Sequence, residues 1–380
     1  MGRSKTAGVA AVVLAAISVL AVVVSLRAPS AGVLRSIGAR GGAPLLKPAG
    51  DSPPAPELTG ISGWLNSDPL TMAGLQRQRQ VVLVDFWTYS CINCRRTFPF
   101  LRRLQEAYGD SGLTIVGVHT PEFDFEKIPE NVADAVEELD VTWPVAQDPA
   151  MSTWNAFGNQ YWPAKYLIDS AGRIRGFHIG EGDEAAVEMG VRTLLREAGA
   201  TLPPTALGGV TAAPRAAGLG EDITRELYLG AQRGADFYDA AGPVPAGSTE
   251  TRDDGATQND PPPRDRVRLT GEWSGAAEYT LASRRGSRLA VDVRARDVYL
   301  LVAPERGFGP VELEVQLRGQ PVPPSLRGRD ITTTRDGRTV LVVGDDDLRH
   351  VITGASVAEH ALTFTARRAG VRFYAFTFGG

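Results

Sequence analysis

Cys91 and Cys94 are the only cysteines of the 380-residue chain, and two residues separate them. An apolar, β-prone run at residues 81–87 precedes them, and residues 94–108 carry apolar side chains at helical spacing. Cys91 is therefore expected at the start of a helix, where free backbone N–H groups and the helix dipole stabilise a thiolate. Cys94, one turn later, can attack the mixed disulfide that this thiolate forms. The spacing predicts thiol–disulfide exchange, with Cys91 as the nucleophile and Cys94 as the resolving thiol.

Three other uses of the cysteine pair are possible. A zinc site needs two further ligands, and only four histidines are available. A structural disulfide across so short a loop would constrain little of the unfolded chain. Two buried, reduced thiols are the third alternative. The strand–turn–helix context favours redox chemistry, so we predict no metal and no cofactor beyond a redox-active Cys91–Cys94 disulfide.

Residues 58–199 alternate between strand-like and helix-like patterns, which is typical of an α/β sheet covered on both faces. The predicted strands are residues 81–87, 113–119, 166–169 and 174–178, and the predicted helices are residues 94–108, 131–139 and 184–198.

The C-terminal part has short, alternating, turn-separated segments without helices between them, a pattern typical of an all-β sandwich. These segments are residues 278–282, 288–294, 298–303, 311–317, 339–343, 360–366 and 371–378.

Several long motifs resemble TlpA-like and especially DipZ-like thioredoxin-fold proteins of the redoxin family. In the first domain they are residues 84–94, 117–123, 154–169 and 180–183; in the C-terminal part they are residues 228–230 and 374–379. The resemblance implies a thioredoxin-like α/β domain, followed by a β-sandwich similar to carbohydrate-binding modules. DipZ-type proteins carry a multi-helix electron-transfer domain before the thioredoxin part, where this chain has one predicted helix. The resemblance therefore implies a separate membrane thiol-electron donor.

The same resemblance suggests roles for two residues beyond the cysteines. Pro163 would be the cis-proline that faces the cysteines, and Trp162 precedes it with backbone free to pair with a client strand. An ordinary trans proline in a loop is the alternative.

Asp85 stands six residues before Cys91, where thioredoxins place a buried carboxylate that accepts a proton from the resolving thiol. A solvated or capping aspartate is the alternative. Trp87 and Tyr89 could form an apolar rim for the client, although both fit a core position equally well. Glu122 follows a strand end near the site in the same family pattern.

Residues 7–26 contain no charged side chain and are long enough, as a helix, to span a bilayer. A cleaved signal peptide is the alternative, although its apolar region is usually shorter. A tethered thiol–disulfide protein with no other cysteines suits an oxidising compartment, so we predict a single-pass cell-membrane protein with its soluble domains extracytoplasmic, in a bacterial envelope. The predicted parts are an anchor or signal segment (1–27), a flexible linker (28–57), a thioredoxin-like domain (58–199), a linker (200–221) and a β-sandwich (222–380) with a disordered loop (240–266).

A net charge of −4 argues against a nucleic-acid partner, and the expected partners are disulfides or thiols of client proteins. No basic group lies between the cysteines to make the pair a strong oxidant, which favours reduction or mild exchange. Two alternatives remain open. Residues 88–91 match the T-x-x-C core of thiol peroxidases. Glycan binding by the C-terminal domain would use Trp273, Tyr279 and Tyr299.

Overall fold

The computed structural model describes residues 46–207, 223–238, 241–253, 255 and 260–379. The predicted membrane helix at residues 7–26 lies outside the described residues, as does most of the linker that follows it. Within the described ranges, no helix is long and apolar enough to cross a membrane.

The first domain contains one mixed, six-stranded sheet in the order β1-β4-β3-β2-β5-β6. Central strand β2 runs parallel to β3 and antiparallel to β5. The strands are β1 (Gly63–Leu65), β2 (Val81–Trp87), β3 (Leu113–His119), β4 (Val145–Gln147), β5 (Ala164–Ile168) and β6 (Ile174–Ile179). The predicted limits of β2 and β3 are confirmed, because uninterrupted apolar runs mark strands buried on both faces.

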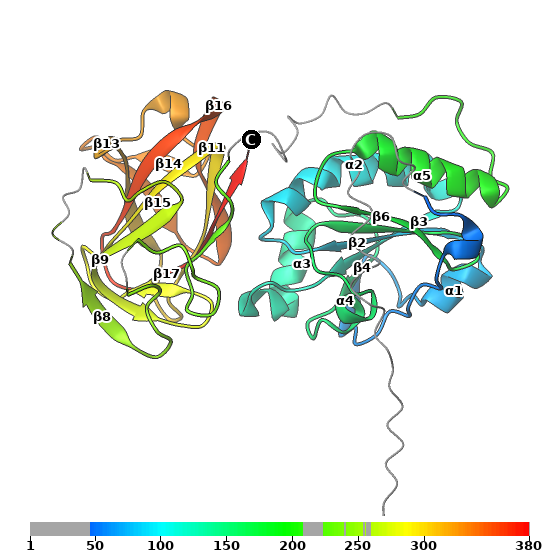
Figure 1. Cartoon of the computed structure of the whole chain (residues 1–380), viewed down its shortest axis with the longest axis horizontal. Coiled ribbons are helices and arrows are strands. Elements are labelled where there is room, and N and C mark those ends of the chain that lie inside the picture. The colour runs from blue at the N-terminus through cyan, green and yellow to red at the C-terminus, as the bar shows by residue number, and fades with distance from the viewer. Residues whose placement is uncertain (1–45, 208–222, 239–240, 254, 256–259, 380) are drawn as a thin grey trace, which may run out of the picture. The chain divides into compact units, whose positions relative to one another are not determined.

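Alternate residues of the central strands enter two different apolar cores. Val81 and Leu83 pack with α2, α3 and α5, whereas Val82 and Val84 pack with α1 and α4. Figure 1 shows α2 and α5 over one face of the sheet and α1 and α4 over the other. The helices are α1 (Met72–Arg77), α2 (Ile92–Tyr108), α3 (Pro129–Glu138), α4 (Ser152–Ala156) and α5 (Glu184–Glu197). The predicted two-sided α/β arrangement is confirmed.

The C-terminal domain is all-β, as predicted, and its strands form one hydrogen-bonded network. Residues 288–292 of β11 pair with β9, and residues 297–304 of the same strand pair with β17. One long strand stands where two were predicted, because register shifts between Ala295 and Asp297 and between Val298 and Tyr299 bend it without ending it. The strands are β7 (Leu227–Tyr228), β8 (Thr249–Arg252), β9 (Arg266–Gly275), β10 (Thr280–Ala282), β11 (Arg288–Pro304), β12 (Val311–Leu317), β13 (Gln320–Pro321), β14 (Ile331–Thr333), β15 (Thr339–Val343), β16 (Asp347–Ala366) and β17 (Val371–Gly379).

The prediction of a disordered loop at residues 240–266 was wrong for β8. This strand pairs with β9 in register from Thr249 to Arg252. It carries almost no large apolar side chains, so its order comes from the ladder and from polar contacts. The buried Arg252 guanidinium, for example, donates to the carbonyl oxygen of Gly242 at 2.6 Å.

The two domains contact each other through apolar side chains. Tyr374 of β17 is 2% exposed, and its ring centroid lies 5.4 Å from that of Phe123 and 5.1 Å from that of Phe125. Leu301 and Leu348 belong to the same cluster, which extends into the core around α2. The C-terminal domain therefore has a separate core and also contributes to the core beside the cysteines.

Candidate active site

The two cysteines occupy the start of α2 and differ in exposure. Cys91 is the N-cap residue and is partly exposed, whereas Cys94 is fully buried. Both are free thiols, and the backbone N–H of Cys94 donates to Cys91 Sγ at 3.3 Å. Burial, followed by the neighbouring Cys91 sulfur and the Asp85 charge, raises the pKa of the Cys94 thiol. The geometry offers one accessible sulfur at a helix N-terminus and one protected sulfur behind it.

Asp85 forms a buried ion pair with Lys165, and its charge acts on the Cys94 thiol. It is 0% exposed on β2, and its Oδ1 lies 3.2 Å from Nζ of Lys165, its register partner on β5. Burial raises the pKa of Asp85, while the charge of Lys165 and its hydrogen bond oppose that shift. Lys165 also donates to Thr97 Oγ1, which in turn donates to the backbone oxygen of Cys94. The pair therefore supports the first turn of α2 from below.

Trp87 and Tyr89 do not form the predicted apolar rim. They are 0% and 4% exposed, because both pack around the buried imidazole of His119. Burial lowers the pKa of His119 to about 3, so this ring is neutral over the physiological range. The rim prediction is therefore corrected to a core role for both aromatic side chains.

The Trp162–Pro163 peptide bond is cis, as predicted. Trp162 is partly exposed and packs beside the same core as Cys91, and its Nε1 donates to the carbonyl oxygen of Thr120 at 3.0 Å. Its ring centroid lies 4.1 Å from that of Trp154. These contacts fix the side chain on the domain that holds the cysteines.

Glu122 contacts the C-terminal domain. Its Oε1 accepts hydrogen bonds of 2.8 Å from both the Tyr228 hydroxyl and the Arg233 guanidinium. Burial and the nearby Glu226 raise the pKa of Glu122 to about 7, against the opposing charge of Arg233. The carboxylate predicted to contact the client is therefore held by the protein itself.

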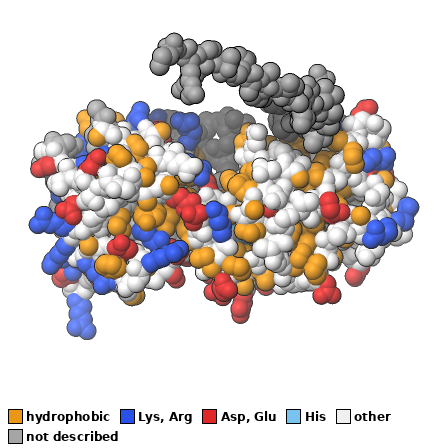
Figure 2. Space-filling model, turned by 90° about the horizontal axis from the view of Figure 1, so that it is seen from below, with side chains coloured by type: hydrophobic (Ala, Val, Ile, Leu, Met, Phe, Trp, Pro, Cys, Tyr) orange, Lys and Arg blue, Asp and Glu red, His pale blue; other side chains and the backbone are white. Residues whose placement is uncertain are grey.

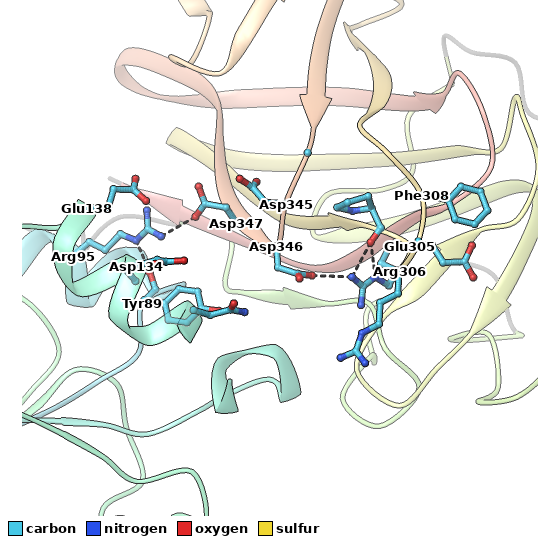
Figure 3. A pocket seen from close by; sticks show the side chains of 16 residues that line it. Tyr89, Arg95, Asp134, Glu138, Glu305, Arg306, Phe308, Asp345, Asp346 and Asp347 are labelled. Atoms are coloured by element: carbon cyan, nitrogen blue, oxygen red, sulfur yellow. Dashed lines mark hydrogen bonds and ion pairs between the residues drawn. The ribbon is translucent and has the colours of Figure 1, made fainter. Parts of the chain in front are cut away.

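A polar pocket of about 340 Å³ lies beside the active-site segment, between α2, α3 and the C-terminal domain. Figure 3 shows Arg95 of α2 pointing toward Asp347, and the two side chains form an ion pair of 2.9 Å. Arg95 also holds the carbonyl oxygen of Tyr89 at 2.5 Å. One arginine thus links the turn before Cys91 to the C-terminal domain.

The aromatic residues suggested for sugar stacking are engaged in internal contacts. Trp273 is fully buried, Tyr279 packs on Tyr374, and Tyr299 stacks on His350. Positive and negative side chains are interspersed on the face in Figure 2. Among the described residues, no group of three or more His, Cys, Asp or Glu side chains is placed to hold a metal ion.

Two charged residues near the cysteines were missed by the sequence analysis. Lys165 is the only charged residue of β5, and Asp85 is the only charged residue of β2. A lone charge in each of two apolar strands could have indicated that the two side chains form a buried ion pair. Glu126 was missed because nothing in its local pattern separates it from the acidic residues around it; its contacts appear only when distant loops meet.

Two family models and several known proteins match the sequence of this chain. A family model described as redoxin matches residues 48–193, and one described as thioredoxin like C-terminal domain matches residues 224–379. Protein DipZ of Mycobacterium tuberculosis is 35% identical over 338 residues, covering 86% of this chain and 43% of DipZ. Thiol-disulfide oxidoreductase YkuV of Bacillus subtilis is 33% identical over 144 residues, covering 38% of this chain and 95% of YkuV.

Among solved structures, a thioredoxin-like protein in the oxidised form is 31% identical to this chain, with a TM-score of 0.35. The match covers 97% of that protein and 38% of this chain. This chain spans less than half the length of the DipZ proteins. It belongs to the thioredoxin-like thiol-disulfide oxidoreductases, with a redoxin domain followed by a DipZ-type C-terminal domain.

Proposed function

We propose that this enzyme reduces or exchanges disulfides of client proteins, with Cys91 as the attacking group. The observation that carries the proposal is the contrast between Cys91, a partly exposed residue at the N-terminus of α2, and Cys94, a fully buried residue one turn later. Only the accessible sulfur can meet a client disulfide, and only the buried one is protected from reacting with other thiols.

In the reducing direction, the Cys91 thiolate attacks one sulfur of the client disulfide. A mixed disulfide forms, and the first client thiolate leaves and takes up a proton. Cys94 then loses its proton and attacks Cys91 Sγ, which forms the Cys91–Cys94 disulfide and releases the second client thiolate. The client gains two electrons and two protons, and the enzyme loses them.

Asp85 is the proposed acceptor of the Cys94 proton. The raised pKa of its carboxyl, caused by burial, makes proton uptake favourable. Lys165 holds the carboxylate at 3.2 Å and keeps it aligned under α2. Trp162 and Pro163 are the proposed client contacts, since the backbone before the proline can pair with an extended client segment.

The proposal includes a place in the cell. Residues 7–26 would anchor the chain in the membrane, and the redox domain would act outside the cytoplasm of a bacterial cell. A separate membrane thiol protein would supply electrons to the Cys91–Cys94 disulfide. The charge-free, apolar stretch and the presence of only two cysteines support this arrangement. Protease added to intact spheroplasts should digest the domain; survival of the domain until the membrane is broken would contradict this topology.

The catalytic proposal is tested with the full-length chain in detergent, with dithiothreitol as the electron donor. The unmodified chain should accelerate insulin disulfide reduction, and Cys91→Ser should lower the rate at least about a hundredfold because the nucleophile is lost. Peroxide consumption is measured in parallel. Retained reduction in Cys91→Ser, or peroxide consumed faster than disulfide is reduced, would contradict the proposal.

A further inference from the structure

Glu126 is a buried carboxylate beside the active-site turn. It lies on the short 3-10 helix Asp124–Lys127 and is 1% exposed. Its Oε1 accepts hydrogen bonds from the Ser90 N–H at 3.3 Å and from the Ser90 hydroxyl at 2.5 Å. Its Oε2 accepts from the N–H of Glu122 at 2.6 Å and from that of Phe123 at 3.0 Å.

These four bonds join two segments that are distant in sequence. Ser90 belongs to the turn between β2 and α2, whereas Glu122 and Phe123 belong to the segment that follows β3. An ionised carboxylate offers about four acceptor positions and no donor, which suits a site where several donors converge. In the described part of the chain, no lysine or arginine forms an ion pair with Glu126. Burial raises the pKa of Glu126, and hydrogen bonds from the side chains of Ser90 and Thr88 and from the backbone of Phe123 and Glu122 oppose that shift.

The turn that Glu126 holds determines where the reactive sulfur lies. Ser90 directly precedes Cys91, and the N–H of Cys91 donates to the carbonyl oxygen of Thr88 at 3.3 Å. This turn places Cys91 as the N-cap of α2, with Sγ over the N–H of Cys94. Arg95 also holds this turn, because its Nε donates to the carbonyl oxygen of Tyr89. A shift of the turn would move Sγ away from the helix N-terminus that stabilises its thiolate.

We propose that Glu126 is a positioning residue for Cys91: its carboxylate ties the Ser90 turn to the Glu122–Phe123 segment and so holds the nucleophile at the start of α2. The inference rests on the proposed role of Cys91. It extends that role by naming a group that does not touch the client but sets how reactive the sulfur is.

The test measures alkylation of Cys91 by iodoacetamide across pH in Cys94→Ser chains, where Cys91 is the only thiol. Glu126→Gln removes two of the four acceptor positions and introduces two donors, so the rate at pH 7 should fall about tenfold and the pH profile should move to higher pH. Ser90→Ala removes one bond and retains the carboxylate, so its rate should fall about threefold. Glu130→Gln, which removes an exposed carboxylate nearby, should leave the rate unchanged.

Two results would overturn the inference. An unchanged rate in both Glu126→Gln and Ser90→Ala would show that the turn needs no such tie. A faster rate in Glu126→Gln with none of the expected loss in Ser90→Ala would show that Glu126 acts through its charge instead.

Alkylation in guanidinium chloride is the control for intrinsic reactivity and should give equal rates for all variants. Ser90→Ala serves as the test if Glu126→Gln fails to fold. Failure of the proposed function is separate, because it appears as retained disulfide reduction in Cys91→Ser.

Discussion

The thioredoxin-like domain and the C-terminal domain bury charged side chains in different surroundings. In the first domain, Asp85, Lys165 and Glu126 lie under or beside the cysteine turn. In the second, the buried Arg252 and Arg372 donate to backbone carbonyl oxygens in the loop at Gly242 and at Pro304, the end of β11. Buried charge in the first domain therefore surrounds the reactive group, and at Arg175 and Arg192 it also fastens loops through their carbonyl oxygens. In the second domain, Arg252 and Arg372 only fasten strands and loops. The chemistry belongs to the first domain, and the second supports it through the contacts at Tyr374, Glu122 and Arg95.

We expect the greatest loss of stability when the C-terminal domain is expressed alone and then shortened. A fragment of residues 223–380 should melt cooperatively, because Leu227, Leu229, Phe237 and Val244 complete its core. The shorter fragment 267–380 holds most of the predicted strands, but it should fail to melt cooperatively because it lacks β7 and β8 and begins inside β9. Circular dichroism melts of both fragments check this. Equal melts would show that the earlier strands are dispensable, and an unfolded 223–380 would show that the two domains form one folding unit.

Removing the apolar contact between the domains should cause the next largest loss of unfolding free energy. Tyr374→Ala removes an aromatic ring that packs on Phe123, Phe125 and Tyr279, and should lower the free energy of unfolding by about 3 kcal/mol. Phe308→Ala, which truncates a ring that is 45% exposed, is the matched control and should change it by less than about 0.5 kcal/mol. Urea titration measures both. Similar values for the two variants would mean that this contact contributes little.

A smaller effect should appear in the pH dependence of stability. The pKa of Glu122 is about 7 in the folded protein, above its usual 4.5, so the folded state binds this proton more tightly than the unfolded state. Its stabilising contribution is complete below about pH 4.5 and is lost as pH rises through 7. Between pH 5 and pH 8, the free energy of unfolding of the unmodified chain should therefore fall by about 2 kcal/mol relative to that of Glu122→Gln. Urea titrations at several pH values, with Glu130→Gln as the control, measure this; parallel curves would contradict the account of Glu122.

Much of the first domain could be predicted from periodicity, and the reason is physical. The runs at residues 81–87 and 113–119 are apolar at nearly every position, which only strands buried on both faces require. The position of Cys91 and Cys94 at the start of a helix could be predicted because a strand pattern precedes them and a helix pattern follows. The cis bond before Pro163 followed from the family resemblance and is confirmed.

The remaining features depend on tertiary contacts that no local pattern encodes. Trp87 and Tyr89 were equally compatible with a surface rim and with a core position until His119 was placed between them. Lys165 gains its partner only through the register of β5 against β2. Strand β8 has no apolar pattern of its own, because the neighbouring strand β9 supplies its order.

Trapping the mixed disulfide shows which thiol attacks the client, Cys91 as proposed or Cys94. Cys94→Ser and Cys91→Ser chains are each incubated in reduced form with an oxidised client, and the cross-linked peptides are identified by mass spectrometry. We expect a mixed disulfide through Cys91 in Cys94→Ser, and little or none in Cys91→Ser because Cys94 is 0% exposed. Trapping through Cys94, with none through Cys91, would contradict this expectation.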